Sequence, residues 1–218
     1  MTADLAFSFA QLAGTLVLRP YVFVFLVTYL VLATRDMGFR ATLGFLGWGF
    51  TVAFVAEYAS TRAGIPFGLY HYTGETRGAE LFLSNVPFFD SLSFPFLAYA
   101  AFCVARWALG ESRTLWTVVA SGVLMMLLDV VIDPLAVRGD RWFLGRVFYY
   151  PEGGIYFGVP LSNFAGWIVV GVVIVGGHAL VARRPPAGSP RLGVAFYYVI
   201  LLFNLVVTAL IGEWRLLS

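Results

Sequence analysis

Long apolar stretches separated by short polar segments cover most of this chain. At least five are long enough to cross a bilayer as a helix, which takes about 17 to 25 residues. The predicted spans are residues 21–34, 41–58, 91–109, 115–133, 160–182 and 192–211. Lipid offers no partner to backbone N–H and C=O groups, so such stretches cross as helices. The pattern predicts an all-α, polytopic membrane bundle that forms one domain over residues 1–218.

A further apolar stretch, residues 5–18, leaves the number of spans open between six and seven. It is short for a crossing, and Arg19 and Pro20 follow it directly. It is either an interfacial helix, a seventh crossing, or the first half of a helix that is kinked at Pro20.

Short basic connections alternate with two long ones, residues 59–86 and 134–159. The short ones are residues 35–40, 106–113 and 183–191. Arginine-rich loops face the cytoplasm, so we expect a multi-pass protein of the cell membrane with both long connections on the opposite face. The long connections are dense in Gly, Pro and aromatic residues, which favours a lid over an internal cavity. An interfacial aromatic belt is the alternative.

Composition excludes several kinds of chemistry. The chain is 60% hydrophobic and 12% charged, with a net charge of +2, and all 14 basic residues are Arg. Without Lys there is no retinal Schiff base, P-loop or Lys nucleophile. The scattered Arg residues form no basic patch, so no nucleic-acid partner is expected. Two His and no G-x-G-x-x-G after a strand predict neither a di-iron centre nor a dinucleotide site, so we expect no metal and no cofactor.

The chain contains two repeat-like halves, about residues 41–109 and 115–182. Each half has an acid at the end of a span, then Gly-Ile-x-Phe-Gly (64–68 and 154–158), then Val-Pro-x-x-Asp/Asn (86–90 and 159–163). Pro suits the start of a helix, and Asp or Asn suits its first turn, where N–H groups are exposed. The halves are therefore expected to place equivalent polar groups on one membrane face.

Four carboxylates lie within or at the ends of apolar spans: Glu57, Asp90, Asp129 and Asp133. An ionised carboxylate at mid-bilayer costs about 2.5–3.5 kcal/mol, so acids in this position are interpreted as functional. Asp129 and Asp133 are four residues apart and share one helix face, as an acid–base pair requires. The structural alternative is that the acids form ion pairs with Arg62, Arg138 or Arg141.

Side chains of the long connections and of the last repeat motif are candidates for binding a substrate. They are Tyr70, His71, Tyr156, Asn163 and Trp167. Aromatic faces can stabilise a cation, although they also anchor membrane interfaces. A lone His is more often structural than catalytic.

Two segments resemble the CruF-type carotenoid biosynthesis proteins, the family of bisanhydrobacterioruberin and γ-carotene hydratases. The first is residues 57–74, EYASTRAGIPFGLYHYTG, and the second is Asp129-Val-Val-Ile-Asp133-Pro134 followed by residues 154–167, GIYFGVPLSNFAGW. The resemblance covers roughly residues 40–182. It implies a membrane-embedded hydratase that adds water to the terminal isopropylidene double bond of an acyclic carotenoid end, giving a tertiary alcohol.

The resemblance carries no catalytic residues over, so the site is assigned from the residues themselves. Hydrating an alkene needs an acid, a stabilised cation and a base that activates water. We expect Asp129 or Asp133 to be the acid, and Glu57 and Asp90 to be the base and water-positioning groups. The expected partners are an acyclic carotenoid, the lipid bilayer and other enzymes of the carotenoid pathway. Alternatives are a lycopene-type cyclase, an intramembrane prenyltransferase, and a carotenoid-binding or transport protein.

Overall fold

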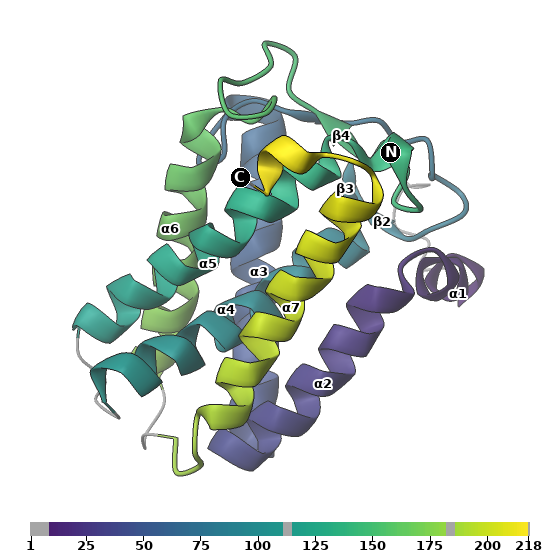
Figure 1. Ribbon diagram of the computed structural model, residues 1–218. Coiled ribbons are helices and arrows are strands. Elements are labelled where there is room, and N and C mark those ends of the chain that lie inside the picture. Colours follow the sequence, from purple (N-terminus) through teal and green to yellow (C-terminus); the bar gives the residue numbers. More distant parts are fainter. Residues whose placement is uncertain (1–8, 111–114, 182–185, 218) are drawn as a thin grey trace.

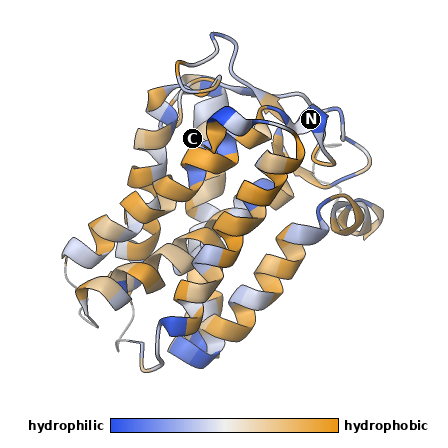
Figure 2. Ribbon diagram, viewed as in Figure 1, coloured by the Kyte–Doolittle hydropathy of each residue, from blue (hydrophilic) through white to orange (hydrophobic). Residues whose placement is uncertain are grey.

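Apolar helices form a bundle in the computed structural model, which describes residues 9–110, 115–181 and 186–217. The six long helices are α2 (Pro20–Met37), α3 (Phe39–Ala63), α4 (Phe88–Leu109), α5 (Leu115–Ala136), α6 (Leu161–Val181) and α7 (Arg191–Leu210). They contain 18 to 25 residues, enough to cross a hydrocarbon core of about 30 Å. Figure 1 shows their arrangement and Figure 2 their hydrophobic character. The predicted polytopic helical fold is confirmed.

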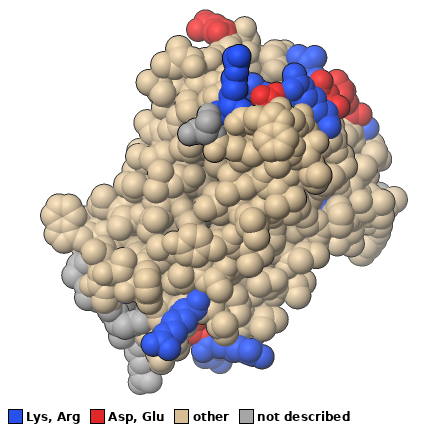
Figure 3. Space-filling view, viewed as in Figure 1, with Lys and Arg blue, Asp and Glu red and all other residues tan. Residues whose placement is uncertain are grey.

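Charged side chains gather at the two ends of the bundle. On the face shown in Figure 3, a broad belt without charged side chains separates the two groups, as expected for a protein that crosses a membrane. The predicted short connections contain residues 111–114 and 182–185, which lie outside the described part of the chain.

The first apolar stretch forms a separate short helix, α1 (Phe9–Leu18). Arg19 interrupts the helix with φ −125° and ψ 48°, and Pro20 then begins α2. Figure 1 shows α1 almost end on, beside the start of α2. Its 10 residues measure about 15 Å along the axis, too short for a crossing. The alternatives of a seventh span and of one kinked helix are therefore wrong for the described residues; residues 5–8 of the stretch lie outside them.

Helix α4 is the central element of the bundle. In the most apolar 18-residue stretch of α4, 83% of the residues are buried, whereas the corresponding stretches of the other five long helices are 22% to 39% buried. It packs against α2, α3, α5, α6 and α7. Any polar group at its start is consequently surrounded by protein and not by lipid, which lowers the cost of placing a carboxylate there.

The two long connections meet on one face of the bundle, as predicted. Strand β1 (His71–Tyr72) pairs antiparallel with β4 (Phe148–Tyr149), so that Tyr72 lies opposite Phe148. A second ladder joins β2 (Phe82–Leu83) to β3 (Val86–Pro87) just before α4 begins. The described residues also contain 3-10 turns at Gly139–Arg141 and Trp214–Leu216. The β1–β4 ladder brings loop residues of both halves together at the helix ends.

Buried ion pairs connect segments at the two ends of the bundle. Arg19 binds Glu80 at 3.0 Å and also donates to the carbonyl of Leu144, so it joins the α1–α2 junction to both long connections. At the opposite end, Arg106 binds Asp36 at 2.6 Å. Guanidinium groups suit such sites because they donate in several directions at once.

The three arginines named as alternative ion-pair partners of the intramembrane acids have other partners. Arg62 donates to Asn85 at 2.8 Å, while Arg138 and Arg141 both bind Glu213. Among the described residues, the intramembrane acids take part in no ion pair with them. The ion-pair alternative is therefore wrong for these arginines.

Candidate active site

Four carboxylates converge at the end of the bundle that the long connections cover. Helix α3 ends at Ala63 and is capped by Gly64, whose left-handed φ of 71° suits glycine, and Glu57 lies about two turns before this cap. Asp90 lies in the first turn of α4, and Asp129 and Asp133 lie in the last two turns of α5. Glu57, Asp129 and Asp133 are buried, and the half-buried Asp90 lines a cavity. The helix ends thus bring together acids that are up to 76 positions apart in the sequence.

Hydroxyl groups link these acids into two sets. The Tyr72 hydroxyl donates to Oδ2 of Asp90 at 2.6 Å and lies 3.2 Å from Oε1 of Glu57. Ser91 also donates to Glu57. In the second set, Tyr150 donates to Oδ2 of Asp133 at 3.2 Å.

Asn163 completes the second set by donating from Nδ2 to Oδ2 of Asp129 at 2.7 Å. Oδ1 of Asp129 is buried and has no hydrogen-bond partner among the described residues. Asn163 lies in the first turn of α6, and Asp90 in the first turn of α4, so the two repeat motifs occupy the predicted helix starts.

The tyrosines on the long connections are held as hydrogen-bond donors. Burial raises the pKa of Tyr70, Tyr72 and Tyr150 well above the ordinary phenol value, and nearby carboxylates raise it further. A charged phenolate would lose its hydration and face negative charge at this position. All three hydroxyls therefore keep their protons at neutral pH. The Tyr70 and Tyr72 oxygens lie 3.3 Å apart, which extends the network into the first connection.

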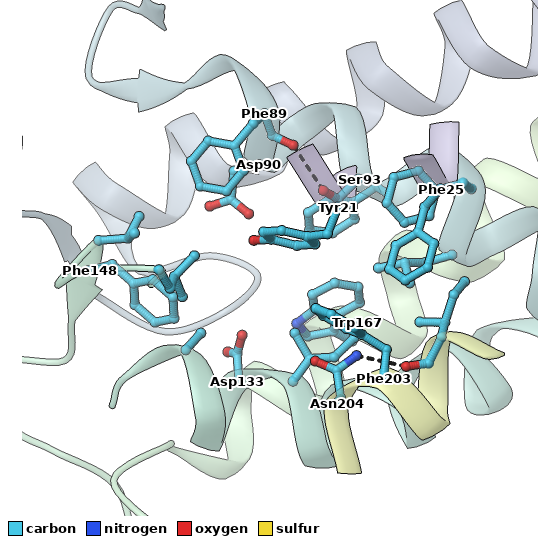
Figure 4. Close-up of a pocket in the computed structure, with 18 of the residues that line it drawn as sticks. Tyr21, Phe25, Phe89, Asp90, Ser93, Asp133, Phe148, Trp167, Phe203 and Asn204 are labelled. Carbon is cyan, nitrogen blue, oxygen red and sulfur yellow. Dashed lines mark hydrogen bonds between the residues drawn. The ribbon is translucent and has the colours of Figure 1, made fainter. Parts of the chain in front are cut away.

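A largely apolar cavity adjoins the acids (Figure 4). It has an empty volume of about 740 Å³, including space that opens to the outside, and its walls come from α2, α4, α5, α6, α7 and the second long connection. Aromatic side chains dominate these walls. Phe94 and Trp167 stack with ring centres 4.4 Å apart and planes inclined by 7°. Asp90 and Asp133 enter the cavity from opposite sides.

A smaller space, with an empty volume of about 300 Å³ that includes room open to the outside, lies beside this cavity, and we call it the polar chamber because most of its lining residues are polar. Its polar lining consists of Glu57, Asp90, Asp133, Tyr70, Tyr72, Tyr150 and Asn163. Asp90 and Asp133 line both spaces, together with Phe94, Phe148 and Trp167. The two carboxylates are thus reached from an apolar side and from a polar side.

The predicted substrate-binding residues divide into two groups. Trp167 lines both spaces, and Tyr70 and Asn163 line the polar chamber. His71 instead packs against Tyr149, with ring centres 5.9 Å apart. Tyr156 packs against Phe157 and Phe164. Neither His71 nor Tyr156 lines either space.

The predicted acids also differ in access. Asp133 lines both spaces, whereas Asp129, one turn earlier on α5, is fully buried and lines neither. Glu57 lines only the polar chamber. Sequence analysis did not identify Tyr72, Tyr150, Ser91, Tyr21 or Asn204 at the site. Asn204 in α7 could have been predicted, because a polar residue within an apolar span is costly and therefore interpreted as functional.

Within the described residues, no group of three or more His, Cys, Asp or Glu side chains is arranged to hold a metal ion. The polar groups that line the two spaces include carboxyl and phenol hydroxyl groups, which can donate and accept protons.

The fold and the site define a multi-pass helical membrane protein with a buried carboxylate cluster facing an aromatic cavity. Comparison with known families matches residues 14–216 to the family described as "Carotenoid biosynthesis protein", and the chain belongs to this family. The resemblance found in the sequence is confirmed, and it extends further toward both ends than residues 40–182.

The chain is also similar to a bisanhydrobacterioruberin hydratase of Haloarcula japonica (strain ATCC 49778). The two are 34% identical over 121 residues, which is 55% of this chain and 38% of that protein. The chain thus matches well under half the length of this curated relative. No solved structure matches the chain.

Proposed function

We propose that this protein is a carotenoid hydratase, which adds water to the terminal isopropylidene double bond of an acyclic carotenoid end and forms a tertiary alcohol. One observation carries the proposal: Asp90 and Asp133 each line both the apolar cavity and the polar chamber. A hydratase of a hydrocarbon must bring its acid and its base to a place where water and an apolar chain meet. Membership of a carotenoid biosynthesis family and similarity to a hydratase support the proposal.

In the proposed reaction the polyene end occupies the aromatic cavity. Asp133 donates its proton to the less substituted alkene carbon, and the positive charge develops on the tertiary carbon. A water oxygen then bonds to that carbon and transfers a proton to the Asp90 carboxylate. The sum is alkene plus water giving alcohol, with no change of oxidation state of the protein and no cofactor required.

The aromatic walls have a direct part in this scheme. Phe94 and Trp167, which stack on each other, line both spaces together with the two carboxylates, so the proposal places an outer face of this pair beside the cation. The negative π-face of an aromatic ring attracts a cation, by about 2 kcal/mol or more when water is excluded. A carbocation has no hydrogen-bonding group, so ring faces stabilise it without capturing it.

Glu57 and Asp129 act as the supporting members of the two sets. Glu57 shares the Tyr72 hydroxyl with Asp90, and Asp129, one turn before Asp133 on α5, is held by Asn163. Neighbouring carboxyl groups disfavour simultaneous ionisation, so a cluster can hold one protonated and one ionised member at the same time. After each turnover, protons pass from Asp90 back to Asp133 through the polar chamber.

The test is isotope labelling with the purified protein in lipid vesicles that contain an acyclic carotenoid. In water enriched in heavy oxygen the alcohol should carry the label, and in heavy water one deuterium should enter the adjacent carbon. The reaction should proceed without oxygen gas, nicotinamide, flavin or iron, and a chelator should not stop it. Cyclisation would give a ring with deuterium but no heavy oxygen, and prenyl transfer a longer chain. An alcohol oxygen that comes from molecular oxygen would refute the hydratase.

A further inference from the structure

Tyr21, in the first turn of α2, has a hydroxyl group that enters the aromatic cavity beside Asp90 (Figure 4). The two side chains are close enough to interact electrostatically. Sequence analysis gave Tyr21 no role, and a Tyr at the end of a span is typical of an interfacial anchor. Its position at the wall of the cavity indicates a role at the site instead.

The ring of Tyr21 is fixed on several sides. It stacks on Phe203 of α7 with ring centres 5.4 Å apart and planes inclined by 19°. Edge or tilted contacts to Phe25, Trp142 and Phe143 surround the rest of the ring. A ring held in this way presents its hydroxyl at one place, because rotation of the side chain would break several aromatic contacts.

Most other polar side chains of the cavity use their donors on the backbone. Ser93 donates to the carbonyl of Phe89 at 2.9 Å, Trp142 to that of Leu135 at 3.2 Å, and Asn204 to that of Ile200 at 2.9 Å. Among the described residues, the Tyr21 hydroxyl and the indole N–H of Trp167 have no such bond. Only the hydroxyl can both donate and accept.

A water molecule needs two to four polar partners to occupy an otherwise apolar cavity. The Asp90 carboxylate supplies an acceptor, and the Tyr21 hydroxyl supplies a group that either accepts from water or donates to it. We propose that Tyr21 is a water-positioning residue, which holds the attacking water against Asp90 on the side of the cavity opposite Asp133. This inference rests on the proposed hydratase activity and assigns the part of the site that receives water.

The geometry predicts a particular defect in Tyr21→Phe. Protonation by Asp133 does not use the Tyr21 hydroxyl, so the carbocation still forms. With water poorly placed, the cation more often loses a proton and returns to an alkene. In heavy water this return leaves deuterium in the recovered carotenoid. The ratio of deuterated alkene to alcohol should therefore rise by about tenfold, the effect of one lost hydrogen bond at the reacting centre.

The experiment measures that ratio for wild type, Tyr21→Phe and Tyr197→Phe in vesicles made up in heavy water. Tyr197→Phe is the matched control: its hydroxyl donates to the Leu124 carbonyl at 2.8 Å, and Tyr197 does not line the cavity. The control should keep the wild-type ratio. Melting temperatures and amounts of purified protein establish that both variants fold.

The outcomes separate the two proposals. A raised ratio in Tyr21→Phe alone supports the water-positioning role. An unchanged ratio overturns it, including the case in which alcohol and deuterated alkene fall equally. A purely structural defect would lower both products together and would not redirect the cation. If wild type forms no alcohol at all, the hydratase proposal itself fails, and that result is visible before any variant is compared.

Discussion

The hydroxyl group of Tyr72 donates to Oδ2 of Asp90 at 2.6 Å, and this hydroxyl oxygen also lies 3.2 Å from Oε1 of Glu57. A phenol has one proton to donate. With two carboxyl groups in reach, it either divides that proton between them or accepts one from the second. The contact therefore couples the protonation of the two carboxyl groups.

Removing this hydroxyl should slow the reaction without weakening substrate binding. In Tyr72→Phe we expect kcat to fall by about tenfold, because one hydrogen bond to a charged group is lost. KM should stay nearly constant, since Tyr72 lines the polar chamber and not the aromatic cavity. Tyr149→Phe, on the same β1–β4 ladder, is the control and should match wild type. Equal defects in both variants would indicate damage to the ladder instead.

Removing the acid should abolish product. Asp133→Asn should insert and fold normally, because a neutral amide is easier to bury than a carboxylate. Product should fall by about 10²–10⁴-fold while unhydrated carotenoid accumulates, as measured by chromatography of extracts from a carotenogenic host. Asp129→Asn should have the milder defect, because Asp129 lines neither space. Full activity of both variants at normal abundance would move the acid to Glu57 or Asp90.

Stability should fall in strong alkali through the buried tyrosines. Burial raises the pKa of Tyr150 in the folded protein, whereas in the unfolded chain it stays near the ordinary value of about 10. Above about pH 10 the unfolded chain releases a proton that the folded protein keeps, so the free energy of unfolding decreases as pH rises. Below about pH 10 the Tyr150 hydroxyl causes no change in the free energy of unfolding with pH. Melting curves between pH 8 and 11 should therefore show a shallower decline for Tyr150→Phe, and parallel curves would contradict the prediction.

The buried pair of Arg19 and Glu80 should show the cost of an unpartnered charge. Arg19→Met leaves Glu80 buried without its partner and should destabilise the protein by about 3–5 kcal/mol. The double variant Arg19→Met, Glu80→Leu should recover most of that loss, because no charge remains to be buried. Thermal unfolding of the three proteins measures this, and a double variant less stable than Arg19→Met would exclude it.

Both long connections should be accessible from one side of the membrane. In a Cys103→Ser background, single cysteines at exposed Glu75 and Glu152 should react with an impermeant thiol reagent from the same side. A cysteine at Arg40, in the first turn of α3 at the opposite end of the bundle, should react only from the other side. Labelling of positions 75 and 152 from opposite sides would overturn the shared site.

The fold could be read from the sequence because a bilayer allows few alternatives. Apolar length alone defines the spans, although α2 extends to Met37, three residues beyond its predicted end at 34. The four acids were found for the same reason, since each is a costly residue in an apolar run. Tyr72 and Tyr150 were missed because their roles depend on the β1–β4 ladder, which pairs residues 76 and 78 positions apart. Arg19 was missed because its partner Glu80 is 61 positions away.

The aromatic cavity is separated from the surroundings of the bundle at α2 and α7 by half-buried side chains, among them Tyr21 and Phe203. A polyene that enters there comes from the bilayer, where it is far more concentrated than in the aqueous phase. Occupancy of the cavity then follows the mole fraction of carotenoid in the lipid. Adding empty vesicles at a fixed amount of carotenoid should slow turnover by dilution, even though the quantity of substrate in the tube is unchanged.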